Sequence, residues 1–172
     1  GTGGKLLISI YKGSSSMSFE SLDVLPLNEW THIAIKLNYN FVGWLYLNGE
    51  FQKYGPLKTP GDTIRTKNYI GKSNWNNDGY ADVIIDEFRI YNYAKEDEEI
   101  MADFRKEVDN PAADTSLITY YNFNSGEGTN IIDHSQFANN GTAYGYPAWY
   151  RVKGPELFLP FNQNNIRPQI SF

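Results

Sequence analysis

The sequence contains no cysteine among its 172 residues. This absence excludes disulfide bonds, thiolate metal sites and cysteine nucleophiles. Histidine is scarce as well, since His32 and His134 are the only two, and no third side chain with the spacing of a zinc ligand accompanies either of them. The sequence therefore predicts neither a zinc centre nor a Ser-His-Asp triad.

Clustered positive charge and long apolar runs are also missing. The net charge is −5 and the Lys and Arg residues form no basic stripe, whereas a nucleic-acid surface gathers such residues against phosphates. No run of about 18 apolar residues is long enough to span a bilayer. We therefore expect no nucleic-acid partner and no membrane insertion. The chain opens with Gly1-Thr2 rather than Met, so we expect that its start lies upstream and that a removed secretion signal would not be visible.

Aromatic residues and glycine are abundant. Aromatics make up 16% of the chain, and there are 15 Gly, a composition that favours short pleated strands joined by tight turns. In residues 31–37, Ile33, Ile35 and Leu37 alternate with Ala34 and Lys36, which predicts a half-buried strand with the first three side chains facing inward. The segments that we expect to form strands are 5–11, 17–25, 31–37, 41–47, 50–54, 67–72, 82–92 and 117–123.

Two local signals predict a turn and a helix. Asn48-Gly49 tolerates positive φ at both positions, so it predicts a two-residue type I′ turn between adjacent strands. One helix is expected over residues 95–106, because acids cluster at its start and basic residues at its end, and both complement the helix dipole.

Three segments follow one another in a fixed order: Trp30-Thr31-His32-Ile33-Ala34-Ile35, Leu45-Tyr46-Leu47-Asn48-Gly49-Glu50, and Asp82-Val83-Ile84-Ile85-Asp86-Glu87-Phe88-Arg89-Ile90-Tyr91-Asn92-Tyr93. This ordered trio resembles the C-terminal half of a laminin-G-like jelly roll, in the concanavalin A-like lectin and glucanase superfamily. The resemblance covers most of the chain and fits residues 151–172 poorly. It implies an all-β fold, an antiparallel jelly-roll sandwich with one short helix, and a binding module rather than an enzyme.

The two parts of this resemblance stand in inverted order. Residues 1–107 resemble the C-terminal part of a sandwich, residues 108–116 indicate a linker or long loop, and residues 117–172 resemble the N-terminal part. Either the chain holds the end of one repeat and the start of the next, or both parts close on each other as one permuted jelly roll. Half a sandwich would leave its core face and strand edges in water, so we expect the parts to pack together, with 117–123 beside 84–91.

Two adjacent acids, Asp86 and Glu87, lie within an apolar run. Neighbouring side chains on a strand point to opposite faces, and neither acid has an alternating partner that would share its face. A retaining glycosidase requires two carboxyl groups about 5–5.5 Å apart. The strand does not supply this pair, so we expect no catalytic residues.

An oxygen-rich loop follows the predicted strand 117–123. Asp133, Ser135 and Asn139 offer hard oxygen ligands, of which Ca²⁺ takes about six to eight, and Asp86 could join them from the closing strand. Many members of the resembled family hold a structural calcium with this loop, so the resemblance implies a Ca²⁺ cofactor at these four residues. Asp and Asn also cap turns, so a purely structural role stays open.

Aromatic side chains gather in two loops, one at residues 74–80 and one after Asp133. Exposed rings stack on the apolar faces of sugars, and neighbouring amides can hydrogen-bond to sugar hydroxyls. The same rings also suit the covered ends of a β-sandwich, and this structural alternative stays open. The candidate ligand-binding residues are Trp75, Asn76, Asn77, Tyr80, Tyr144 and Trp149.

These features predict a non-catalytic module that binds glycans or proteins at a cell surface or in an extracellular assembly, with a role in cell adhesion. Neighbouring repeats of a larger protein are further expected partners. The alternatives are a purely structural repeat of an adhesin or fibrous assembly, and a glycoside hydrolase or its accessory module. Much of this interpretation rests on the resemblance, and a fold by itself does not establish a function.

Overall fold

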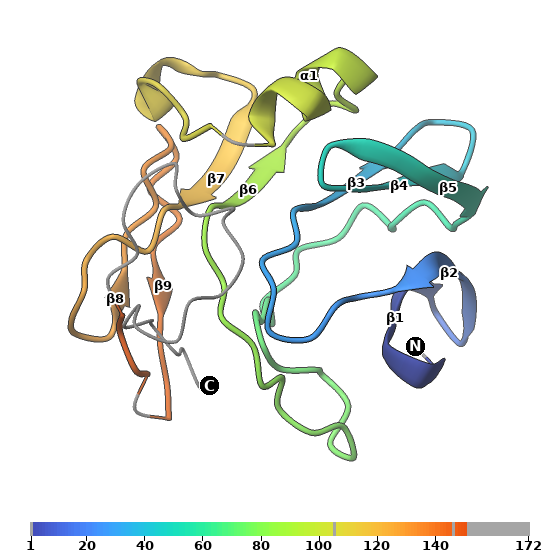
Figure 1. Cartoon of the computed structure of the whole chain (residues 1–172), viewed down its shortest axis with the longest axis horizontal. Coiled ribbons are helices and arrows are strands. Elements are labelled where there is room, and N and C mark those ends of the chain that lie inside the picture. The colour runs from blue at the N-terminus through green and yellow to red at the C-terminus, as the bar shows by residue number, and fades with distance from the viewer. Residues whose placement is uncertain (1, 105, 146, 151–172) are drawn as a thin grey trace. The chain divides into compact units, whose positions relative to one another are not determined.

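The computed structural model describes residues 2–104, 106–145 and 147–150 (Figure 1). The chain divides into two compact units, and each sheet lies within one of them. The first unit contains the chain up to Thr63 together with Ala94–Lys106, and the second contains Ile64–Tyr93 and the described chain from Glu107 onward. The strands pair antiparallel and the described residues contain one α-helix, which confirms the predicted fold class.

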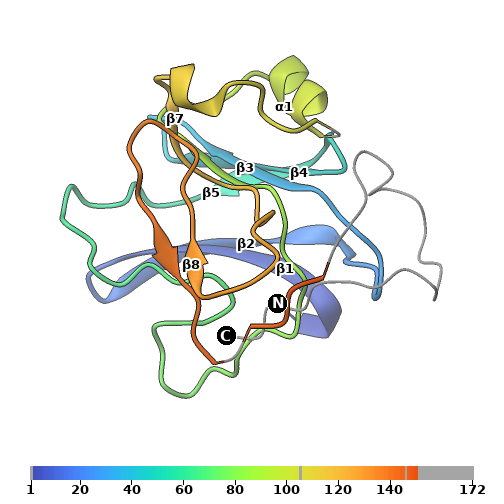
Figure 2. The same cartoon turned by 90° about the vertical axis from the view of Figure 1, so that its left-hand side faces the viewer.

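The first unit consists of two layers of strands (Figure 2). One layer is a two-stranded hairpin and the other is a three-stranded sheet in the order β3-β4-β5. A 3₁₀ turn, Thr2–Gly4, precedes the hairpin. The strands are β1 (Lys5–Lys12), β2 (Ser15–Val24), β3 (Ile33–Leu37), β4 (Val42–Leu47) and β5 (Glu50–Pro56). Each of these five was predicted.

The core of the first unit lies between the two layers. Its buried members are Ile8 and Phe19 from the hairpin, Leu45 and Leu47 from β4, and Leu57 just after β5. A pair of facing glycines opens the space for this packing. Gly43 pairs with Gly55 across β4 and β5, and a Cβ atom at Gly55 would lie 2.8 Å from the Phe19 ring. The absence of these two side chains therefore allows the hairpin to approach the sheet.

Strand β3 is less buried than the sequence indicates. Ile33 and Ile35 pair with Leu47 and Leu45, and directly paired residues share a face of the sheet, so the predicted inward face is right. Both side chains are nevertheless only partly covered, since Ile33 is 41% exposed and Ile35 is 50% exposed. β3 is the edge strand, and the hairpin packs against β5 at the opposite edge. The alternation of apolar and polar residues indicates which face of the sheet a side chain occupies, but it does not indicate whether another layer covers that face.

The turn between β4 and β5 is the predicted one. Asn48 and Gly49 have φ values of 54° and 82°, and Leu47 pairs with Glu50 on either side of them. Positive φ at both central residues characterises a type I′ turn, whose twist matches that of the flanking strands.

Helix α1 (Asp97–Asp103) is shorter than the predicted 95–106. Its start is fixed by the Glu96 backbone N–H, which donates to the Glu99 carboxylate at 2.8 Å, as in a capping box. The Tyr46 hydroxyl donates to Asp97 at 2.6 Å, and Lys36 forms an ion pair with the same carboxylate. These contacts hold the helix on the face of the sheet opposite the core.

The seven-residue length of α1 also means that no helix in the described part of the chain has the length to cross a membrane.

In its described residues, the second unit contains two small ladders and long loops. Its elements are β6 (Phe88–Tyr91), the 3₁₀ turn Pro111–Ala113, β7 (Leu117–Tyr121), β8 (Asn130–Ile131) and β9 (Gly141–Thr142). β6 pairs with β7 and β8 pairs with β9.

Two strands predicted in this unit were wrong in extent or existence. Residues 67–72 are not a strand, and the predicted strand 82–92 is reduced to β6. Glu87 has a φ of 55° and Gly71 a φ of 76°. Extended strands require negative φ, so each of these residues interrupts the segment in which it lies.

The predicted pairing of residues 117–123 with 84–91 is confirmed for residues 88–91 and 117–121, because Phe88 pairs with Tyr121 and Ile90 with Thr119. This ladder joins a strand of the predicted first part, 1–107, to a strand of the predicted second part, 117–172. The segment between them, 108–116, is tied back by the Asn92 N–H, which donates to the Ser116 carbonyl at 2.9 Å. The division into those parts stays a prediction.

Candidate functional site

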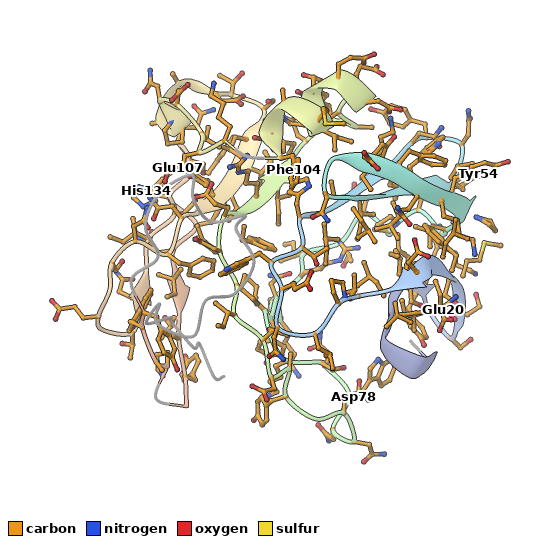
Figure 3. All side chains as sticks on the ribbon, in the orientation of Figure 1. Glu20, Tyr54, Asp78, Phe104, Glu107 and His134 are labelled. Atoms are coloured by element: carbon orange, nitrogen blue, oxygen red, sulfur yellow. The ribbon has the colours of Figure 1, made fainter. Side chains whose placement is uncertain are left out.

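The loop between residues 67 and 80 surrounds a cavity of about 360 Å³ in the second unit. Asp78 marks this loop in the lower part of Figure 3. The cavity is open to solvent and its wall mixes aromatic rings, amides and charges. The lining residues are Lys67, Tyr69, Lys72, Ser73, Asn74, Trp75, Asn76, Asp78 and Tyr80.

Hydrogen bonds close this loop on itself. The Ala81 N–H donates to the Gly71 carbonyl at 2.8 Å, and the Asp78 N–H donates to the Trp75 carbonyl at 3.2 Å. The Trp75 N–H in turn donates to the Ser73 hydroxyl at 3.0 Å. Backbone and side-chain bonds of this kind replace a sheet ladder in polar loops. They give the loop a defined shape although it is not a strand.

Two aromatic side chains in the cavity wall are largely open to solvent. Trp75 is 60% exposed and Tyr80 is 64% exposed. The Lys72 ammonium lies 4.9 Å from the centroid of the Tyr69 ring, within the range of a cation–π contact. Exposed rings beside amides and charges can both stack on a ligand and hydrogen-bond to it.

The structure brings together three of the six predicted ligand-binding residues. Trp75, Asn76 and Tyr80 line the cavity, whereas Asn77 does not. Tyr144 is exposed elsewhere in the second unit. The Trp149 indole N–H donates to the Gly128 carbonyl at 2.9 Å, and Trp149 does not line this cavity.

Sequence reasoning missed the basic side of the cavity. Lys67, Tyr69 and Lys72 were assigned to a strand, where alternate side chains would point to opposite faces. One signal was available, because residues 63–77 contain three basic residues and no acid in a chain whose net charge is −5.

Asp133 is the centre of a second, buried cluster. Its Oδ1 accepts hydrogen bonds from the Tyr120 N–H at 2.8 Å and the Ser135 N–H at 3.0 Å. Its Oδ2 accepts from the Asn139 N–H at 2.8 Å and the Ser135 hydroxyl at 2.9 Å. Burial opposes ionisation of Asp133, yet the bonds from Tyr120, Ser135 and Asn139 outweigh it and hold its pKa below the ordinary value.

This cluster ties the loop after β8 to strand β7. The Asn139 side-chain amide donates to the Ile118 carbonyl at 3.0 Å, and the Ser135 hydroxyl oxygen lies 3.1 Å from the same carbonyl. The structure thus brings three of the four predicted calcium ligands together. No hydrogen bond in the described chain links Asp86 to them; its carboxylate accepts from the Glu87 N–H at 2.9 Å. Calcium at these residues stays a prediction.

Asp86 and Glu87 form a third polar group, together with Tyr120 and Arg89. Burial, together with the charges of Glu87 and Glu107, raises the pKa of Asp86 to about 7. The Glu87 carboxylate accepts from the Tyr120 hydroxyl at 2.9 Å and forms an ion pair with Arg89. Burial and the Glu87 carboxylate also raise the pKa of Tyr120. Across residues 2–104, 106–145 and 147–150, no three His, Cys, Asp or Glu side chains converge as metal ligands.

Comparison with known families decides the relationship that the sequence suggests. Residues 1–101 match the concanavalin A-like lectin/glucanases superfamily, which is more than half of the 172 residues. This chain belongs to that superfamily. No curated protein matches it.

Two solved structures are similar to this superfamily member. A candidate carbohydrate binding protein from Bacteroides ovatus is 21% identical with a TM-score of 0.60, and the match covers 79% of this chain and 39% of that one. An S-layer domain-containing protein from Clostridium thermocellum is 27% identical with a TM-score of 0.43, covering 59% of this chain and 52% of that one. The chain therefore spans less than two thirds of either protein. The first likeness shows the fold alone.

The superfamily is named for both lectins and glucanases, so membership of it does not establish whether a protein binds carbohydrate or cleaves it. Asp86 and Glu87 are the acids in the apolar run that was considered above for catalysis. Glu87 is already engaged by Arg89 and Tyr120, and its left-handed backbone ends the extended strand on which an alternating pair would need to lie. Neither acid lines the cavity at residues 67–80.

Proposed function

We propose that this protein is a non-catalytic binding module that recognises glycans in the cavity formed by residues 67–80. The observation that carries the proposal is the convergence of Trp75, Tyr80 and Tyr69 with Asn74 and Asn76 on one cavity of about 360 Å³. Sugar rings offer flat C–H faces to aromatic side chains, and their hydroxyls pair with amides.

The exposure of these rings supports a ligand rather than a purely structural role. Leaving most of an indole ring in water forfeits the stabilisation of about 1.5–3 kcal/mol that full burial of a large apolar side chain provides. A loop that holds Trp75 and Tyr80 open gains that stabilisation when a ligand covers them. The superfamily and the name of the Bacteroides ovatus protein agree with a carbohydrate ligand.

The module acts outside the cell or on its surface in this proposal. The cavity argues against the first alternative, a spacer repeat without a ligand. The ion pair of Glu87 with Arg89 argues against the second alternative, a glycoside hydrolase.

The proposal is tested with an array of immobilised glycans and two variants. Trp75→Ala and Tyr80→Ala should each weaken binding by about fivefold or more, since stacking on one ring contributes about 1–3 kcal/mol in comparable base–aromatic contacts. Tyr39→Ala is the matched control, because Tyr39 is fully open to solvent but lies outside the cavity. Binding to no glycan, or binding that survives both cavity variants, would overturn the proposal.

A further inference from the structure

We propose that the glycan held by the 67–80 loop carries a negative charge, as a carboxylate or a sulfate group on a pyranose ring. This inference rests on the proposed function and specifies its ligand class. It is carried by two lysines, Lys67 and Lys72, which line the same cavity as Trp75 and Tyr80.

The charge around the cavity differs in sign from that of the chain. Residues 63–77 carry three basic side chains and no acid, within a protein of net charge −5. Of the charged residues that line the cavity, two are basic and one, Asp78, is acidic. A small positive region in an acidic protein attracts an anion locally while the rest of the surface repels large polyanions such as nucleic acid.

Neither lysine is neutralised by a carboxylate within the described residues. No ion pair there engages Lys67 or Lys72. The Lys72 ammonium rests over the Tyr69 ring at 4.9 Å. A cation–π contact orients an ammonium group without cancelling its charge, so Lys72 stays available to pair with an anion that enters the cavity.

The geometry places charge and stacking in one site. An ammonium group is a compact point charge with three N–H donors, and it pairs with carboxylate, sulfate or phosphate oxygens. Trp75 and Tyr80 supply ring faces in the same wall. A ligand that uses both must present an anionic substituent next to an apolar face, which is the chemistry of uronic acids and sulfated sugars.

The test measures binding of three oligosaccharides of equal length by calorimetry: one neutral, one with uronic acid residues and one with sulfate groups. Wild type should bind at least one acidic form about tenfold more tightly than the neutral form, as two partly exposed ion pairs would give. This preference should fall when NaCl is raised from about 20 to about 500 mM, because salt screens exposed charges. Acidic forms that bind only as tightly as the neutral one would overturn the inference and leave the proposed function standing.

Variants separate the charge from the stacking surface. Lys67→Gln with Lys72→Gln should abolish the preference for acidic sugars, so that acidic and neutral forms bind this variant equally well, and Lys12→Gln, an exposed lysine outside the cavity, is the matched control. Trp75→Ala should weaken both kinds of binding. Poly-glutamate serves as a further competitor, and equal competition by it would overturn the inference. If no sugar binds, or binding is indifferent to Trp75→Ala, the proposed function itself has failed.

Discussion

At the residue scale, one type of side chain performs two different tasks in this protein. Asp133 is 5% exposed and accepts four hydrogen bonds, whereas Asp86 is partly buried with one backbone donor. The donors keep Asp133 ionised. Burial and the neighbouring charge of Glu87 favour the protonated form of Asp86. Their pKa values therefore move in opposite directions.

Replacing Asp133 with Asn tests both its structural role and the predicted calcium site. Asp133→Asn puts an NH₂ donor where one oxygen accepts a hydrogen bond, so we expect the free energy of unfolding to fall by about 1–3 kcal/mol. Melting curves recorded with calcium and with chelator measure the contribution of the metal to stability, separately from the contribution of the hydrogen bonds. If calcium binds at Asp133, Ser135, Asn139 and Asp86, it raises the melting temperature of wild type and not of the variant.

The control for this measurement is Asp62→Asn, at an exposed acid that lies outside the cluster. If wild type melts at the same temperature in calcium and in chelator, the prediction of a calcium site is wrong. Asp133 would then be a hydrogen-bonded anchor only. A variant as stable as wild type would contradict the anchoring role too.

Asp86 predicts a pH dependence of stability. Its pKa is about 7 in the folded protein against 3.8 for an ordinary Asp, so between these values the unfolded chain loses a proton that the folded chain retains. The free energy of unfolding therefore falls as pH rises from about 4 to about 7, and it levels off above that range. Asp86→Asn should remove this decline and stabilise the protein at pH 8 by on the order of 2 kcal/mol.

Chemical denaturation in chelator, at several pH values, provides the measurement for Asp86. An unchanged pH profile in the variant would mean that Asp86 is already ionised in the folded state at neutral pH.

At the element scale, the glycine pair between β4 and β5 decides how the hairpin meets the sheet. A Cβ atom at Gly55 would approach the Phe19 ring to 2.8 Å, and Phe19 belongs to the buried core. Gly55→Ala should therefore lower the free energy of unfolding by about 1–3 kcal/mol through overpacking.

Gly61→Ala is the matched control for the packing argument. A Cβ atom there has no neighbour within 4 Å, and its φ is not in the left-handed region. Denaturant midpoints of the two variants give the comparison. A Gly55→Ala protein as stable as Gly61→Ala would show that the two layers can separate without cost.

At the scale of the whole molecule, the ladder between β6 and β7 joins strands on either side of residues 108–116. Limited proteolysis near Asn110–Ala113 should therefore yield two fragments that stay associated under native conditions, because the ladder and the Asn92–Ser116 bond span the cut. Gel filtration of the nicked protein, compared with the same sample in denaturant, measures this association. Fragments that separate and remain folded would contradict the prediction of one closed domain.

The sequence by itself determined the features that depend on local dihedral angles and periodicity. Asn48-Gly49 predicted its turn because few other residues adopt positive φ at low cost. The alternation in β3 predicted which face Ile33 and Ile35 occupy. Trp75 and Tyr80 were recognised as candidate ligand residues from their place in a polar loop.

Only the tertiary structure decided what covers each face and which loop residues meet. Ile33 and Ile35 stay half exposed since their strand lies at an edge. Lys67 and Lys72 join Trp75 because Gly71 breaks the expected strand and bends the chain into a loop. Asp133 became a hydrogen-bonded anchor once Tyr120, Ser135 and Asn139 were brought around it. Such contacts depend on residues far apart in the chain or on departures from regular backbone, and no local pattern encodes them.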